Sequence, residues 1–109
     1  MNNFPLTYNA WHLVHLSYNS DSAVNDPSFW VNAISESVSE RKTPSGTYLG
    51  DSSTNLNIGN SEGTTRTWDG LLDEFRMYDG ILPTGWINTE YNNQVNPSTF
   101  YSVGLQEIP

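Results

Sequence analysis

Trp68-Asp69-Gly70-Leu71-Leu72-Asp73-Glu74-Phe75-Arg76-Met77-Tyr78-Asp79-Gly80 is the stretch that decides the expected fold of this chain. An Asp-Gly dipeptide stands near each end and favours a tight turn, because glycine takes positive φ without steric cost and aspartate hydrogen-bonds its own backbone. Between the turns the residues alternate with period two, which predicts one strand whose first face carries Leu71, Asp73, Phe75 and Met77. Phe75 and Met77 predict that this face is buried. Asp73 shares it, so its carboxylate needs a partner.

Size and charge narrow the class of protein. A chain of 109 residues with a net charge of −8 fits one domain, for which we predict a lead-in over 1–9 and a folded core over 10–106. The negative charge opposes binding to nucleic acid and to anionic membrane surfaces. There is no cysteine, hence no disulfide or thiolate metal site, and no apolar run approaches the roughly 20 residues of a membrane span. We therefore expect no nucleic-acid partner and no membrane insertion.

Outward from the opening stretch, the pattern predicts several short strands and one helix. The helix spans 86–93, is capped by Thr84, and places Ile87 and Tyr91 on one face. Asn96-Pro97 ends it, because the residue before proline avoids the helical region. Strands are expected at 11–18, 28–34 with a turn at Asn32-Ala33, the exposed segment 35–46, 47–50, 55–59 with Leu56 and Ile58 inward, 72–78 and 99–106. This order predicts an all-β sandwich.

Three pieces of sequence carry a resemblance to a known family: the strand 11–18 with Trp11-His12, the Phe29-Trp30-Val31-Asn32 hairpin, and the strand to Tyr78 followed by Trp86-Ile87. Together they resemble the laminin-G-like modules of the concanavalin A-like lectin/glucanase superfamily. The resemblance implies an antiparallel two-sheet jelly-roll sandwich with one short helix near the C-terminus. Such modules have further strands before the Trp-His strand, so we expect an N-terminally truncated module. Ala33 replaces the family's glycine, which predicts a less tight hairpin.

Catalysis is not expected. Retaining glucanases need two carboxyl groups about 5 Å apart, which an alternating run on one strand supplies. Here Glu36 and Glu40 stand four apart in a polar stretch, while Asp73 and Glu74 point to opposite faces of the predicted strand. No Gly-x-Ser-x-Gly elbow is present either. We interpret these carboxylates as solvated charges and the protein as no enzyme.

Asp73 is the candidate metal ligand. The resemblance implies a structural Ca²⁺ held between a sheet edge and loops by the aspartate that matches Asp73. Calcium needs several oxygen ligands from converging segments. The alternatives are that Asp73 accepts backbone N–H groups or pairs with Arg66 or Arg76, each of which would satisfy a half-buried carboxylate.

Two other groups of potential ligands are weaker. His12 and His15 stand three apart and fall on opposite faces of a strand, so a shared transition metal is not expected. The loop with Asp21, Asn25 and Asp26 is rich in oxygen ligands but lacks EF-hand spacing. We interpret it as a plain polar turn.

Carbohydrate binding is the hypothesis that the aromatic residues support. Sugar C–H faces stack on indole and phenol rings, and amides or carboxylates bond the hydroxyl groups. If Val14 and Leu16 face the core, the outer face of that sheet presents aromatic and polar groups. The candidate binding residues are Trp11, His15, Trp30, Asn32, Tyr48 and Trp68. The alternative is that these rings pack under loops or fill an interface.

The sequence therefore predicts a non-catalytic carbohydrate-binding or adhesion module of a larger extracellular or cell-surface protein, with a glycan or protein partner. A structural or protein-interaction sandwich without a small ligand, completed by self-association into a homo-oligomer, is the competing hypothesis. An accessory fragment of a glycan-active enzyme is a third. Fold alone does not decide among them.

Overall fold

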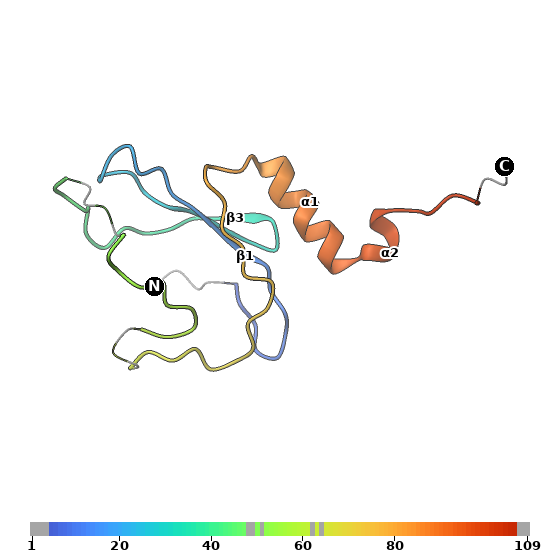
Figure 1. Cartoon of the computed structure of the whole chain (residues 1–109), viewed down its shortest axis with the longest axis horizontal. Coiled ribbons are helices and arrows are strands. Elements are labelled where there is room, and N and C mark those ends of the chain that lie inside the picture. The colour runs from blue at the N-terminus through green and yellow to red at the C-terminus, as the bar shows by residue number, and fades with distance from the viewer. Residues whose placement is uncertain (1–4, 48–49, 51, 62, 64, 107–109) are drawn as a thin grey trace.

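A computed structural model of the chain describes residues 5–47, 50, 52–61, 63 and 65–106. Its β-strands form one antiparallel sheet in the order β1-β2-β3, and two helices follow late in the chain (Figure 1). The strand bounds are β1 Val14–Ser17, β2 Ser28–Val31 and β3 Ile34–Glu36. The helices are α1 Thr84–Val95 and α2 Pro97–Phe100. The strands predicted at 11–18 and 28–34 and the exposed strand of 35–46 are thus confirmed in shorter form.

The turn between β2 and β3 lies at Asn32-Ala33, as predicted. Both residues have positive φ, 51° and 63°, which is the backbone that a two-residue hairpin turn requires. The hairpin is tight despite Ala33, which lacks the freedom of glycine. Asn32 anchors the turn to Leu13, just before β1: its Oδ1 accepts the N–H of Leu13 at 3.1 Å, and its own N–H donates to the Leu13 carbonyl at 2.9 Å.

Register gives the sheet one apolar face and one more polar face. Val14 pairs with Val31 and Leu16 with Phe29, while Val31 also pairs with Ile34, so these side chains project from the same side. His15 pairs with Trp30 and Ser17 with Ser28 on the opposite side. The predicted alternation along β1, with His15 on the other face from Val14 and Leu16, is confirmed.

The apolar face of the sheet is largely uncovered. Val31 is 2% exposed, but Val14 is 50%, Leu16 is 56% and Ile34 is 66% exposed. Among the described residues, Val31 and Ile87 are the buried hydrophobic side chains. The radius of gyration is 18.1 Å, against about 13 Å for a compact domain of this length. The described part of the chain therefore buries few apolar side chains and leaves much of its apolar surface open.

Helix α1 confirms the predicted helix but not its cap. The residue before the helix is Pro83, no side chain caps it, and Thr84 is the first helical residue. Proline there presets an extended entry without needing a hydrogen-bond partner of its own. Ile87 is fully buried and Tyr91 half-buried, as their shared face predicts. The helix ends at Val95 before Asn96-Pro97, also as predicted.

Three predicted strands are wrong. Residues 72–78, the described residues of 55–59, and 101–106 form no strand, and α2 occupies the start of the predicted 99–106 strand. A strand exists only where a neighbour completes its hydrogen bonds, and proline at the first position of α2 favours a helix instead. In 72–78, Glu74 also adopts φ 52°, which interrupts an extended backbone. The predicted 47–50 strand falls partly outside the described residues.

The inward side chains predicted for these segments are also wrong. Phe75 is 57% and Met77 72% exposed, and Leu56 and Ile58 are 64% and 51% exposed. Alternation marks which residues share a face, but a face becomes core only when another layer covers it.

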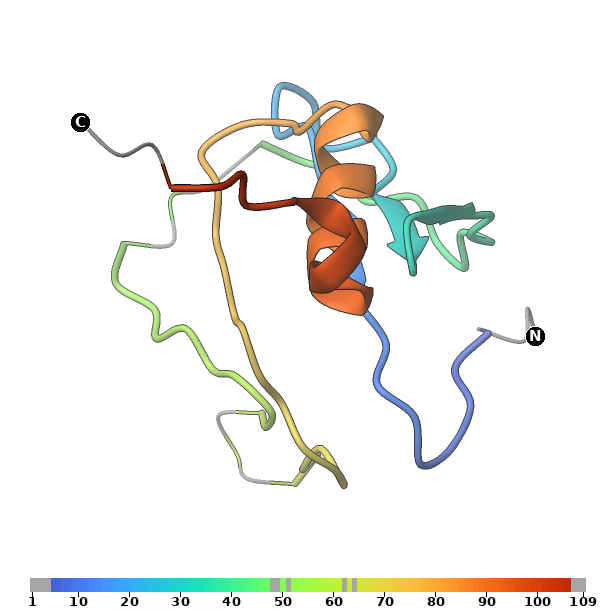
Figure 2. The ribbon, with the colours of Figure 1, turned by 90° about the vertical axis from the view of Figure 1, so that its right-hand side faces the viewer.

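The C-terminal segment stands apart from the rest. Figure 2, turned from the view of Figure 1, shows the chain after α2 running away from both the sheet and α1. Apolar residues alternate with polar or small residues along it, and the apolar residues Tyr101, Val103 and Leu105 are 62%, 85% and 99% exposed. In the described part of the chain, neither helix has the length and apolar character needed to cross a membrane.

Candidate functional site

The candidate site is a pocket at the base of the loop between Gly59 and Trp68. The Trp68 N–H donates to the Gly59 carbonyl at 2.7 Å and closes the loop across its ends. The pocket has a volume of about 330 Å³ and is lined by Gly59, Asn60, Ser61, Arg66, Thr67 and Trp68. This volume lies at the lower end of small-molecule sites.

Gly70 makes room for the Trp68 ring, and Gly59 makes room for the Leu72 side chain. A Cβ on Gly70 would lie 2.9 Å from Nε1 of the indole, closer than non-bonded atoms approach. A Cβ on Gly59 would lie 3.1 Å from Cδ1 of Leu72, and Gly59 has a φ of 75° that favours glycine. The indole therefore packs closely against the backbone of Gly70, and Trp68 is still 51% exposed. A ring that is fixed and half-exposed can receive a ligand at little entropic cost.

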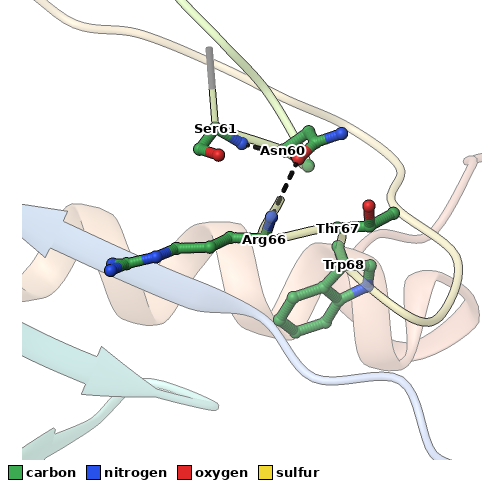
Figure 3. Close-up of a pocket in the computed structure, with 6 residues that line it drawn as sticks. Asn60, Ser61, Arg66, Thr67 and Trp68 are labelled. Atoms are coloured by element: carbon green, nitrogen blue, oxygen red, sulfur yellow. Dashed lines mark hydrogen bonds between the residues drawn. The ribbon is translucent and has the colours of Figure 1, made fainter. Parts of the chain in front are cut away.

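Asn60 shapes the polar wall of the pocket. Its Oδ1 accepts the backbone N–H of Ser61 at 2.8 Å and that of Arg66 at 3.3 Å, so one side chain joins both arms of the loop (Figure 3). Ser61 Oγ lies 3.4 Å from Thr65 Oγ1 and accepts the Thr65 N–H at the same distance. In these bonds, side chains of the loop hold the loop's own backbone in place.

Hydrogen-bonding groups remain free on this wall. Nδ2 of Asn60, Oγ1 of Thr67 and the guanidinium of Arg66 make no hydrogen bond or ion pair in the described part of the chain. Figure 3 shows the Arg66 side chain extended away from the loop, with the Trp68 indole beside it. The pocket thus combines an aromatic wall with polar groups that are open to a ligand.

Among the sequence-predicted binding residues that the structure describes, only Trp68 lines this pocket. Trp11 is 66% exposed elsewhere on the surface. His15 and Trp30 are brought together across β1 and β2, with ring centroids 5.3 Å apart in an edge-on contact at 72°. Tyr48 lies outside the described residues. The structure thus pairs His15 with Trp30 and places Trp68 in the pocket, so the predicted residues do not form one site.

Asn32 is committed to the hairpin. Besides accepting the Leu13 N–H, it places Nδ2 3.1 Å from Nδ1 of His12, whose Nε2 lies 3.1 Å from the backbone nitrogen of Thr7. These contacts tie the lead-in, the start of β1 and the turn together. The Asn32 amide therefore has a structural role, which its bonds to Leu13 and His12 explain without a ligand.

Asp73 is exposed, and its Oδ1 accepts the backbone N–H of Glu74 at 2.8 Å. The sequence suggested a backbone N–H, Arg66 or Arg76 as the partner of this carboxylate. In the described residues the partner is the backbone N–H, and neither arginine pairs with Asp73. No group of three or more His, Asp or Glu side chains converges anywhere in that part of the chain. Among the described residues, Asp73 therefore stands outside any cluster of charged side chains that could share a Ca²⁺ ion with it.

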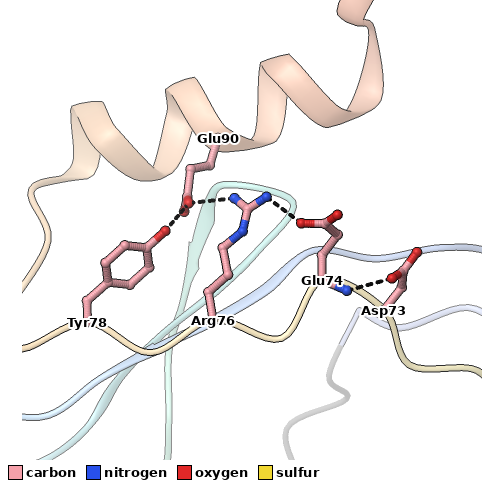
Figure 4. Close-up of polar contacts among 5 residues, drawn as sticks. All are labelled: Asp73, Glu74, Arg76, Tyr78 and Glu90. Carbon is pink, nitrogen blue, oxygen red and sulfur yellow. Dashed lines mark hydrogen bonds and ion pairs between the residues drawn. The ribbon is translucent and has the colours of Figure 1, made fainter.

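A polar cluster joins 74–78 to α1. The Arg76 guanidinium contacts both Glu74 and Glu90, and Glu90 also accepts a hydrogen bond from the Tyr78 hydroxyl (Figure 4). Tyr78 and Trp86 meet edge-on with ring centroids 6.5 Å apart. Partial burial raises the pKa of Glu90, but the hydrogen bonds from Tyr78 and Arg76 outweigh it and hold that pKa below its ordinary value. Bonds to Glu74 and Glu90 raise the pKa of Arg76. The cluster is structural in character.

Sequence reasoning missed the neighbours of Trp68, namely Asn60, Ser61, Arg66 and Thr67. They belong to a segment that looked like a plain polar loop. The available signal was its position: a polar loop that leads directly into an aromatic residue followed by Asp-Gly places amides and hydroxyls beside a ring. Only the closure of Gly59 on Trp68 shows that the loop returns to that ring.

One protein family matches most of this chain. Residues 1–88 match the laminin G family model that describes the concanavalin A-like lectin/glucanases superfamily. The chain belongs to this family. The match covers the sheet, the Trp68 pocket and the start of α1 in this laminin G-like chain. Searches of curated proteins and of solved structures found no match.

Membership implies a β-sandwich fold, and the structure of this laminin G-like chain contains one three-stranded antiparallel sheet. It also supports a binding or adhesion module, since laminin G-like domains are generally non-catalytic. The predicted family resemblance is thus confirmed.

Proposed function

We propose that this laminin G-like chain is a non-catalytic carbohydrate-binding module of a larger extracellular or cell-surface protein, and that a saccharide stacks on Trp68. The pocket of Trp68 is the observation that supports the proposal. A pyranose ring has an apolar C–H face and a rim of hydroxyl groups, so it suits one aromatic wall beside several free polar groups. Asn60, Arg66 and Thr67 supply that second wall.

Glycan-array screening of the full chain, followed by calorimetry on the best ligand, tests this proposal. Trp68→Ala should remove most of the binding, because stacking on an aromatic ring is worth about 1 kcal/mol or more beyond buried area. Trp11→Ala is the matched control: its ring is 66% exposed and does not line the pocket. Binding lost in Trp30→Ala but kept in Trp68→Ala would place the sugar on the sheet instead. No binding to any glycan would overturn the proposal.

A second candidate function rests on the uncovered apolar face. Val14, Leu16 and Ile34 surround the buried Val31 and are each at least half exposed. A two-sheet jelly roll would cover this face with a second layer. We propose that a second copy of the chain supplies the layer, because the alternating segment 101–106 extends away from its own sheet and offers apolar side chains of matching period.

The oligomeric state tests this second candidate. Size-exclusion chromatography with light scattering should give a dimer, and Leu16→Lys should shift it toward monomer because a charge would be buried in the contact. Lys substitution of Asn57, an exposed residue away from the sheet, is the control. A monomer at all concentrations would contradict the interaction function and leave the carbohydrate proposal intact.

A further inference from the structure

A second, larger groove lies away from the Trp68 pocket. It has a volume of about 630 Å³ and forms where the loop after β1 meets residues 77–81. Tyr18, Asn19 and Asp21 line one side, and Tyr78 and Asp79 line the other. No residue lines both this groove and the Trp68 pocket, so the two are independent.

The tyrosines of the groove are fixed by their hydroxyl groups. The Tyr18 hydroxyl donates to the Ser22 carbonyl at 3.3 Å, and the Tyr78 hydroxyl donates to Glu90 on α1. The side chains are 43% and 41% exposed. Both residues line the groove, and the Tyr78 ring also meets Trp86 edge-on. The face of a tyrosine ring carries partial negative charge, which attracts cations.

The charged groups of the groove have one sign. Asp21 and Asp79 are exposed and form no ion pair in the described part of the chain, and no lysine or arginine lines the groove. Asn19 Oδ1 accepts the backbone N–H of Asp21 at 2.9 Å and so fixes the loop that carries this carboxylate. The whole chain has a net charge of −8, which favours encounter with a basic partner.

We propose that this groove docks a lysine or arginine side chain presented by a basic segment of a partner protein. The carboxylates of Asp21 and Asp79 pair with the cationic head, and the tyrosine faces add cation–π attraction. The side chains of Met77 and Ile81, 72% and 59% exposed, give the aliphatic stem an apolar surface. Carboxylates beside tyrosine rings define the partner as one that presents a cationic side chain. The Trp68 pocket does not share this chemistry.

The test uses the intact ¹⁵N-labelled protein, a short oligoarginine peptide, and the same peptide with neutral citrulline in place of arginine. The arginine peptide should bind at low ionic strength and shift the amide signals of 18–21 and 77–81, and the citrulline peptide should not. D21N/D79N should weaken binding about fivefold, as expected for exposed ion pairs. Asp26→Asn removes one charge from the same loop region without lining the groove, so it should retain nearly full affinity.

Three results would overturn the proposal. Equal weakening by Asp26→Asn and by D21N/D79N would show attraction to net charge alone. Equal binding of the citrulline peptide would show an apolar surface with no role for charge. Ca²⁺ alone producing the same amide shifts and blocking the peptide would make the groove a metal site. Amide spectra that otherwise match the parent protein confirm that D21N/D79N is folded.

Discussion

Arg76 and Glu90, fourteen residues apart in the chain, lie 2.9 Å apart between Nη1 and Oε1 and join the segment before the helix to α1. Glu90 accepts from Tyr78 at the same oxygen. Its side chain is 15% exposed, whereas those of Arg76 and Glu74 are 43% and 55% exposed. Glu90 is therefore the hub of the cluster, since a shielded carboxylate depends more on its partners.

Glu90→Gln should lower the free energy of unfolding by about 1 kcal/mol, because two hydrogen bonds to a charged acceptor become bonds to a neutral amide. Chemical denaturation of the two proteins measures the difference. Glu74→Gln is the matched control, since this carboxylate contacts Arg76 at the surface and should cost at most about 0.5 kcal/mol. An equal cost for both variants would show that Glu90 is no hub.

Stability should fall with acid through Glu90. The pKa of this group is lowered from its ordinary value of 4.5 in the folded protein, so its contribution is complete above that value. The contribution is lost as the pH falls through the lowered, folded-state pKa. The free energy of unfolding against pH should therefore drop less on the acid side in Glu90→Gln than in the parent protein. Parallel curves would contradict the shift.

Ala33→Gly should stabilise the hairpin. Ala33 has a φ of 63°, and an L-residue in the left-handed region costs about 1–2 kcal/mol, partly offset by the roughly 0.5–1 kcal/mol of extra chain entropy that glycine loses on folding. A net gain of about 0.5 kcal/mol is expected from thermal or chemical unfolding. Ala23, which does not have positive φ, provides the control: Ala23→Gly should destabilise. A loss of stability in Ala33→Gly would contradict the turn geometry.

Gly70→Ala should displace the Trp68 indole. The added Cβ would meet Nε1 at 2.9 Å, so the ring or the turn must shift. The indole N–H resonance of Trp68 should move by NMR, and any saccharide bound in the pocket should bind more weakly. Gly85→Ala is the control, because a Cβ there meets nothing within 4 Å. An unchanged resonance would show that the ring is not held by Gly70.

Melting curves in Ca²⁺ and in EDTA should superimpose. Asp73 satisfies Oδ1 with the Glu74 N–H, and no cluster of metal-ligating side chains surrounds it in the part of the chain that the structure describes. Differential scanning fluorimetry measures the two melting temperatures. A rise of several degrees with Ca²⁺ that Asp73→Asn abolishes would show that this residue binds the ion.

Local pattern predicted the segments whose partners are close in sequence. The hairpin of β2 and β3 follows from alternation interrupted by Asn32-Ala33, and α1 follows from the spacing of Ile87 and Tyr91. The 72–78 segment has the same alternation and forms no strand. Its side chains bind α1 instead, through contacts with Glu90 that period-two patterning does not encode.

The candidate site shows the same division. Trp68 was proposed from its chemistry alone, since an indole ring suits the C–H face of a sugar. Its neighbours could not be predicted, because the loop returns to the ring through the Gly59–Trp68 hydrogen bond and through backbone approach at Gly70. The contact of His15 with Trp30 was implied by a shared face, but only the register of β1 against β2 sets it.

The sequence by itself determined the family, the alternating faces of the first strands and the position of the helix, because each depends on residue type and on spacing within a short stretch. The tertiary structure decided which apolar face is covered, which N–H group the Asp73 carboxylate accepts, and which loop meets Trp68. Burial and hydrogen bonding are properties of pairs of segments. The pattern of one segment defines which faces and hydrogen-bonding groups it presents. The approach of a second segment determines which of these are buried or bonded.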